Sequence, residues 1–91
     1  MNPMNHVLKS WPEFFQPVLD DVKKFDLRMN DRNFKVGDRI LFREYEPDGK
    51  RYTGRECSRD VIYILDGIGQ GCIEPYKGLL RGYCILGLRE P

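Results

Sequence analysis

The sequence has no apolar run approaching the roughly 20 residues that a membrane-spanning helix needs. Its first residues, Met1 to His6, also lack the basic start and the continuous apolar stretch of a secretory signal. These two absences argue against a membrane protein and against export. We therefore expect a soluble, cytoplasmic protein with no membrane partner.

Cysteine and histidine are scarce as well. Cys57, Cys72 and Cys84 are odd in number and widely spaced, unlike a disulfide framework or a Cys-x-x-Cys zinc pair. We expect three free thiols. With a single histidine, His6, and no nucleophile elbow, the sequence favours neither a metal site nor a Ser-His-Asp triad, and no cofactor is expected.

An excess of one charge is missing too. The chain has 15 basic and 14 acidic residues, a net charge of +1, and the two signs interleave. Overall charge therefore cannot hold a polyanion, and any binding of nucleic acid must use a local, shaped patch. What is present is a chain of 91 residues of which 41% are hydrophobic. That is enough for one core, so we predict a single domain over residues 1–91.

A short helix is predicted after a brief strand at residues 6–9. Ser10 and Glu13 have the spacing of a capping box, in which each side chain accepts a hydrogen bond from the other residue's amide. The helix is expected over roughly residues 11–19, with Pro17 disturbing it or ending it early. The apolar face expected to dock on a sheet comprises Trp11, Phe14, Phe15, Val18 and Leu19.

The rest of the chain has the patterns of strands. Phe25, Leu27 and Met29 alternate with charged residues, which predicts a strand with its apolar face half-buried. A Pro-Asp-Gly turn at 47–49 lies between strand-like segments at 39–45 and 51–53, a pattern typical of a hairpin. Further strands are predicted at 61–65 and 83–88, so the fold class is α+β, a small barrel or strongly bent sheet of five or six strands.

A glycine-rich loop is predicted before the last strand, over residues 66–82. Its Gly67-Ile68-Gly69-Gln70-Gly71 stretch invites a phosphate-loop interpretation. The stretch lacks the Gly-Lys-Ser/Thr ending that such a loop requires, and no helical pattern clearly follows it. A flexible loop is the better interpretation, and its glycines are also compatible with a lid over a cleft.

The segment from Asp21 to Arg28 resembles the ASCH signature, a G-x-K-x-x-E-x-R pattern at the start of a barrel strand. Lys23 and Arg28 match it, whereas Asp21 stands where the family usually has Gly and Asp26 where it has Glu. The flanking pieces of the resemblance are His6, Leu8, Lys9, Trp11-Pro12, Asn30-Asp31-Arg32, Phe34, Val36-Gly37-Asp38 and Arg43-Glu44-Tyr45. Nearly the whole chain is thus similar to a compact bacterial and phage branch of ASCH proteins without assigned function. The resemblance implies a PUA-like β-barrel with a cleft between the first helix and the barrel.

This resemblance also implies that the signature residues line the cleft. A lysine offers a mobile ammonium for phosphate or carbonyl oxygen, and an arginine offers a planar fork for bidentate contacts. The alternative is an ion pair at a strand edge that orients a turn and binds nothing. The candidate ligand- or RNA-binding residues are Lys9, Ser10, Trp11, Lys23, Asp26, Arg28, Arg32, Arg43 and Tyr45.

Three functions compete at this point. The first is a module that binds RNA or a nucleoside-like ligand, with cations on phosphate or sugar and an aromatic ring stacked on a base. The second is an amidohydrolase, because one ASCH branch cleaves acetylated cytidine with a signature lysine, a hydroxyl residue three positions on and a glutamate. Lys23 would be the catalytic residue, but Asp26 occupies the hydroxyl position. The third is a protein-interaction module.

Overall fold

The computed structural model of the chain describes residues 3–66, 79 and 82–91. Its elements are β1 (Asn5–Ser10), α1 (Pro12–Leu19), β2 (Phe25–Met29), β3 (Arg39–Glu46), β4 (Arg51–Asp66) and β5 (Tyr83–Arg89). The strands form one sheet in the order β1-β3-β4-β5-β2, in which β1 is parallel to β3 and the other neighbours are antiparallel. The predicted α+β class, with five strands and one helix near the N-terminus, is confirmed.

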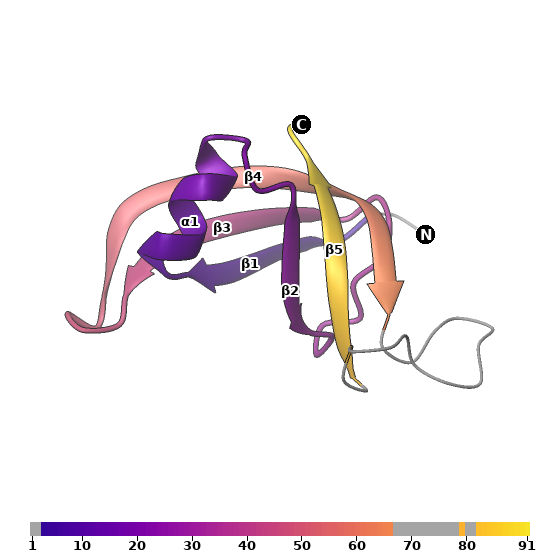
Figure 1. Cartoon of the computed structure of the whole chain (residues 1–91), viewed down its shortest axis with the longest axis horizontal. Helices are drawn as coiled ribbons and strands as arrows, with labels where there is room; N and C mark the ends of the chain where they lie inside the picture. The colour runs from indigo at the N-terminus through magenta and orange to yellow at the C-terminus, as the bar shows by residue number, and fades with distance from the viewer. Residues whose placement is uncertain (1–2, 67–78, 80–81) are drawn as a thin grey trace.

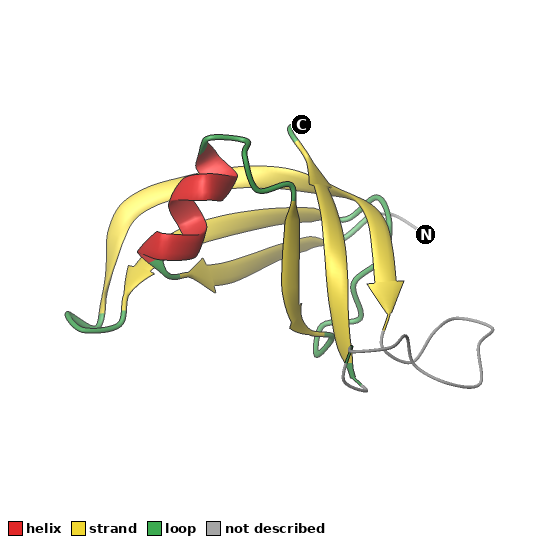
Figure 2. Cartoon of the chain, in the orientation of Figure 1, coloured by secondary structure: helices red, strands yellow, loops and turns green. Residues whose placement is uncertain are grey.

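The long strand β4 bends this sheet into a half-barrel. Its first part pairs with β3 and its last part with β5, so β2, β5 and the end of β4 stand across the line of β1 and β3 (Figures 1 and 2). Two irregularities lie along it: Gly54, with φ of +94°, opposite the register shift of β3, and Ile62, which has no partner on β5. Such bulges re-aim a strand. One bent strand therefore replaces the two strands predicted at 51–53 and 61–65.

The helix covers the concave side of the sheet. Only Phe15 and Val18 of its predicted apolar face are buried, together with Ile40, Phe42 and Leu86 of the sheet. The other three residues of that predicted face, Trp11, Phe14 and Leu19, are exposed. A helix of eight residues turns only a narrow stripe toward the sheet, and the rest of the apolar side chains lie at its rim. In the described part of the chain, no helix is long and apolar enough to cross a membrane.

The predicted capping box does not form. The N-cap of α1 is Trp11, which makes no side-chain capping bond. Ser10 instead ends β1, is buried, and lies in register with Glu44 of β3. The helix begins one residue later than the predicted box requires, so Ser10 stands before the N-cap position, and Glu13 is the second helical residue rather than the third.

The C-terminus of α1 is held more firmly than its start. The amides of Asp21 and Val22 donate to the carbonyls of Val18 and Pro17, which is a Schellman motif with Asp21 at the left-handed position, φ +58°. The buried guanidinium of Arg59 on β4 also donates to the Val18 carbonyl at 2.7 Å, placing a cation at the negative end of the helix. The helix is thus anchored to the sheet at this end.

The strand β2 presents its faces the opposite way from the sequence prediction. Phe25, Leu27 and Met29 are exposed, whereas Asp26 is buried and Arg28 half-buried. The prediction of a strand was right and the choice of its buried face was wrong. The reason is position: β2 is an edge of the sheet, and its inner face looks onto the other edge, β1, rather than onto the apolar core.

Asp38 ties the N-terminal segment to the loop before β3. Its carboxylate accepts hydrogen bonds from the Met4 amide at 3.0 Å, the Lys35 amide at 2.9 Å and the ring of His6 at 2.8 Å. Burial raises the pKa of Asp38, but these hydrogen bonds outweigh it and hold the pKa below its usual value. The only histidine of the chain is thus a buried structural partner, stacked edge-on against Phe34.

Replacing Asp21 with glycine should stabilise the protein. A non-glycine residue in the left-handed region is strained, and glycine is the preferred residue at this position of a Schellman motif. We expect Asp21→Gly to raise the free energy of unfolding by about 0.5–1 kcal/mol in urea denaturation. Asp20→Gly is the matched control, because the C-cap residue Asp20 has a right-handed φ of −77°, so glycine there relieves no strain, adds flexibility and removes the hydrogen bond from Gln16. An Asp21→Gly protein less stable than wild type would contradict this account.

Replacing Asp38 with asparagine should destabilise the protein in a pH-dependent way. Hydrogen bonds to a buried charge are each worth about 1.5–3 kcal/mol, so Asp38→Asn should lower the free energy of unfolding at pH 7 by about 2 kcal/mol. The folded-state pKa is depressed, so the carboxylate stabilises the fold above its unfolded pKa of about 3.9. That contribution is lost as pH falls through the folded pKa, and the gap between wild type and variant should narrow below about pH 4.

The measurement is urea denaturation at several pH values. Asp48→Asn, which changes an exposed carboxylate in the β3–β4 turn, is the control and should behave as wild type. Equal stability of the wild type and Asp38→Asn at pH 7 would show that the charge of the Asp38 carboxylate adds nothing to the free energy of unfolding.

Candidate ligand pocket at the strand seam

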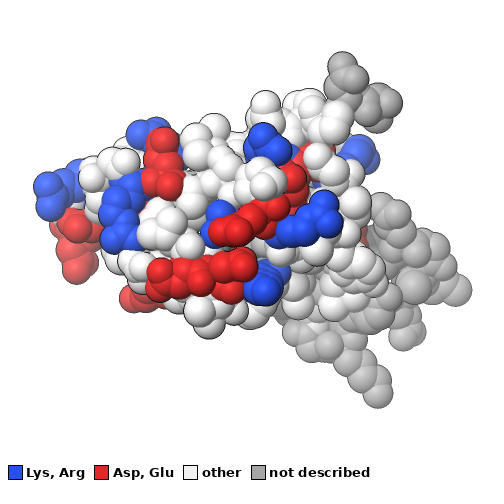
Figure 3. Space-filling view, turned by 90° about the horizontal axis from the view of Figure 1, so that it is seen from above, with Lys and Arg blue, Asp and Glu red and all other residues white. Residues whose placement is uncertain are grey.

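Basic residues of the described chain are mostly matched by carboxylates. The exposed pairs include Arg39 with Asp60 and Arg43 with Glu56, both at 2.9 Å, and Arg51 with Glu46 at 3.3 Å. Figure 3 shows the two signs interleaved on the face seen from above. A continuous basic track is not visible on this face.

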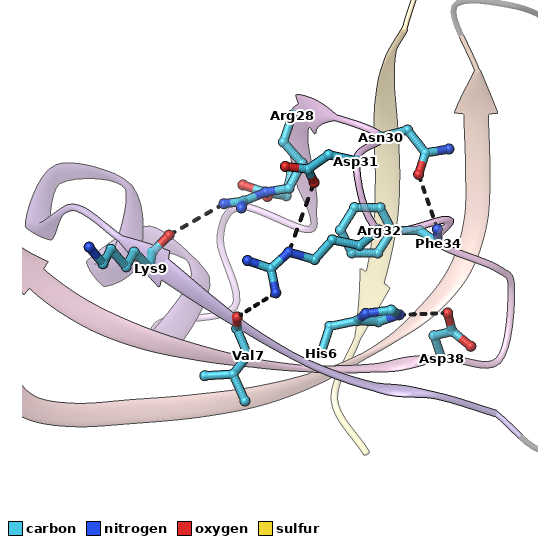
Figure 4. A network of polar contacts seen from close by, with 10 residues as sticks. His6, Val7, Lys9, Arg28, Asn30, Asp31, Arg32, Phe34 and Asp38 are labelled. Carbon is cyan, nitrogen blue, oxygen red and sulfur yellow. Dashed lines mark hydrogen bonds and ion pairs between the residues drawn. The ribbon is translucent and has the colours of Figure 1, made fainter.

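The edges of the sheet, β1 and β2, meet across a seam that side chains close. Arg28 donates to the carbonyl of Lys9 at 3.4 Å, and Arg32 donates to the carbonyl of Val7 at 3.2 Å (Figure 4). Both carbonyls lie on β1, on the edge away from β3. The guanidinium groups therefore occupy the place that a sixth strand would take.

A pocket of about 590 Å³ opens beside this seam. Pockets for small ligands have volumes of roughly 300–1,000 Å³, so the size suits one compact molecule. The walls come from the end of β1, the start of α1 and the strand β2. The lining residues are Lys9, Ser10, Trp11, Phe14, Lys23, Phe25, Asp26, Leu27 and Arg28.

The polar part of the pocket is a fixed cluster around Asp26. One carboxylate oxygen of this buried residue lies 3.6 Å from the ammonium of Lys23, and the other accepts a hydrogen bond from the Nε of Arg28. Two cations and one anion give the cluster a net charge of +1. Each carboxylate oxygen keeps a lone pair for a further donor, and the Lys23 ammonium keeps donors for an acceptor.

The apolar part of the pocket consists of aromatic rings that are about half exposed: Trp11, Phe14 and Phe25. The rings of Trp11 and Phe14 lie 6.4 Å apart with an angle of 28° between their planes. The Lys23 ammonium lies near the rings of Phe14 and Phe25, 5.2 Å from the centre of the first and 5.4 Å from the centre of the second. Flat apolar walls thus flank the charged cluster.

Of the nine residues predicted for the site, the structure brings six to this pocket. They are Lys9, Ser10, Trp11, Lys23, Asp26 and Arg28. The sequence reasoning missed Phe14, Phe25 and Leu27, because their helical or alternating spacing assigned them to the core. A signal was available for Phe25: it lies two residues from Lys23, inside the signature itself.

The other three predicted residues lie elsewhere. Arg32 is engaged at the seam. Arg43 and Tyr45 do share a face, as expected, but that face is the outer side of the sheet, away from the pocket. Lys9 borders the pocket but turns its ammonium to this outer face, 4.4 Å from the Tyr45 ring centre. On the same face the guanidinium of Arg43 lies 4.0 Å from the Tyr52 ring centre. Arg43 and Tyr45 therefore do not extend the pocket.

The structure describes two of the three cysteines of the chain. Cys57 and Cys84 are free and buried, while Cys72 and the Gly67–Gly71 stretch lie outside the described residues. Among the residues with a described position, no group of His, Cys, Asp and Glu could hold a metal ion. The pocket itself contains neither cysteine nor histidine.

Comparison with known proteins gives a family but no activity. A family model described as "Domain of unknown function (DUF3850)" matches residues 5–88 of the chain. No curated protein matches the sequence. The match spans every described strand except the last residue of β5, and it includes the whole pocket.

The thiol of Cys84, which faces Arg28 across the β2–β5 ladder, should resist alkylation. Burial first, and then the carboxylates of Asp66 and Asp26, raise its pKa to about 11. Iodoacetamide at pH 8 should therefore leave Cys84 unmodified in the folded protein and modify it fully in guanidinium chloride, as read by peptide mass spectrometry. Modification of folded Cys84 at the rate of a free thiol would contradict the packing described here.

Proposed function

The chain belongs to the DUF3850 family, whose function is unknown, and we propose that its pocket binds one planar, nucleobase-like unit. The observation that carries this proposal is the combination of half-exposed aromatic rings with a fixed polar cluster in a pocket of about 590 Å³. The unit is either a free nucleoside or an unpaired base of RNA, which present the same ring to the pocket.

Stacking and edge recognition would use different residues. A flat heterocycle has an apolar face that packs on Trp11 or Phe14, and such stacking contributes about 1–3 kcal/mol per base. Its edge carries hydrogen-bond donors and acceptors. Asp26 would accept from a ring N–H or exocyclic amine, and Lys23 would donate to a carbonyl, ribose or phosphate oxygen.

The proposal gives electrostatics a minor role. Lys23 and Arg28 are already paired with Asp26, so the cluster offers about one unit of free positive charge rather than a track for a polyanion. Affinity would come mainly from stacking and shape. This favours a nucleoside-sized ligand or one extruded base over the tracking of a long RNA backbone.

Binding is favoured over hydrolysis by the same contacts. The amidohydrolase resemblance requires a hydroxyl residue three positions after Lys23, and Asp26 there is buried in two ion pairs. A carboxylate cannot replace the missing hydroxyl group, and its ion pairs with two cations reduce its nucleophilicity.

Trp11 provides the test, because it is the only tryptophan of the chain. Titration with nucleosides should quench its fluorescence if a base stacks on the ring. Phe14→Leu keeps the pocket apolar but removes a flat wall, and it should weaken binding roughly tenfold, in line with the stacking energy of one base. Tyr52→Leu removes an exposed ring on the outer face of the sheet and is the matched control.

Four outcomes discriminate among the functions. Saturable quenching by nucleosides that depends on Phe14 supports the proposal. If only single-stranded RNA binds, and log affinity falls with log salt by about 0.7 per phosphate contact, backbone recognition replaces it. Release of acetate from acetylated cytidine that disappears in Lys23→Ala would show that the protein is an amidohydrolase. Quenching by neither nucleosides nor RNA would contradict a nucleobase pocket.

A further inference from the structure

The outer face of β2, β5 and the end of β4 is apolar from Tyr83 to Gly87, and the charged Arg89, opposite Asp60, ends it. Phe25 lies opposite Gly87 and Leu27 opposite Ile85, so these residues share one face of the sheet. Gly87 in turn lies opposite Tyr63, and Ile85 opposite Leu65. The uncharged residues of this face are Phe25, Leu27, Met29, Tyr83, Ile85, Gly87, Tyr63 and Leu65.

Solvent reaches this face to an unusual degree. Phe25 is 49%, Leu27 55%, Met29 52% and Tyr63 62% exposed. A fully covered aromatic side chain buries roughly 150–250 Å². Four half-exposed side chains of about this size therefore leave roughly 400 Å² of apolar surface open to solvent. With the partly exposed Tyr83, Ile85 and Leu65, the exposed apolar area is on the order of 600 Å². Apolar patches on monomeric proteins rarely exceed roughly 300–600 Å².

The pocket does not account for this face. Only Phe25 and Leu27 touch the pocket, because β2 is an edge strand and both of its sides border the opening. Met29 and the residues of β5 and β4 do not line it. A second surface of the protein is therefore left without a partner among the described residues.

We propose that this chain forms a two-fold symmetric dimer through the outer face of β2, β5 and the end of β4. About 600 Å² per copy, extended by residues at the rim such as Ile62, approaches the roughly 800 Å² per partner of a stable interface. The outer faces of two sheets pack at about 10 Å, and a two-fold axis lets one apolar surface serve both copies.

Charge and shape both favour a second copy as the occupant. Arg89, at the end of the face, lies opposite the carboxylate residue Asp60, and the rest of the face has no charge to attract nucleic acid or an anionic membrane. A net charge of +1 puts no long-range repulsion between two copies. Gly87 carries no side chain between Phe25 and Tyr63, and a Cβ there would lie only 3.2 Å from the Cβ of Tyr63, so the two rings flank bare backbone.

The dimer would also bring a second copy to the mouth of the pocket, since Phe25 and Leu27 belong to both surfaces. Ligand binding and association would then be linked, each changing the affinity of the other by the same factor. This linkage rests on the proposed function, whereas the dimer itself does not.

The test is the mass of the full chain in solution, by sedimentation equilibrium from low to high micromolar concentration. Wild type should approach twice the monomer mass. Leu27→Lys places a charge on the middle residue of β2, within the face, and should raise the dimer dissociation constant at least tenfold. Val22→Lys puts the same charge on a 78% exposed residue outside the face and should leave the dissociation constant unchanged.

A wild type that stays monomeric at every concentration overturns the proposal, and so does a Leu27→Lys protein that dimerises as wild type does. Far-UV circular dichroism checks that the variants are folded. If Leu27→Lys fails to fold, Tyr63→Ser answers the same question from β4, on a different strand. A wild type that dimerises but binds no nucleoside would contradict the proposed function and leave the dimer proposal intact.

Discussion

The contact on which the rest of this structure depends is the closure of the seam between β1 and β2 by two guanidinium groups. A five-stranded half-barrel has two edges, and the carbonyls of an unpaired edge need donors. Arg28 and Arg32 supply them to Lys9 and Val7. Because a long side chain spans more distance than a backbone hydrogen bond, the two strands stay further apart than neighbours in a ladder, and the space beside them remains open as the pocket.

This closure also sets the orientation of β2. Donors for the seam must come from the inner face of the strand, so Arg28 points inward, and Asp26 points inward to hold it. Because successive side chains of a strand point to opposite faces, Phe25, Leu27 and Met29 then lie on the outer face. A polar pocket and an apolar outer surface are thus two results of one constraint.

Local sequence patterns predicted the helix and strands well, but they predicted less well which face of each element is buried. The helix, the hairpin turn and the strand character of residues 25–29 follow from spacing that neighbouring residues determine. The period of a strand, however, does not say which face is buried; that depends on β2 being an edge, which is set by pairing with β5 some sixty residues away. The same ambiguity assigned Phe14 and Phe25 to the core. The resemblance did place Lys23, Asp26 and Arg28 together, and the glycine expected at Asp21 corresponds to a left-handed residue, φ +58°.

The aromatic wall of the pocket is positioned from the far end of the helix that carries it. A helix of eight residues is not stable alone, so α1 depends on tertiary contacts. Those contacts are the buried Phe15 and Val18 and the bond from Arg59 to the Val18 carbonyl. Since these three fix the helix on the sheet, Trp11 and Phe14 are not needed for packing and remain exposed at its first turn. Half-exposed rings that the fold does not require for its core, held beside a charged cluster, are therefore the feature on which the proposal of a ligand pocket rests.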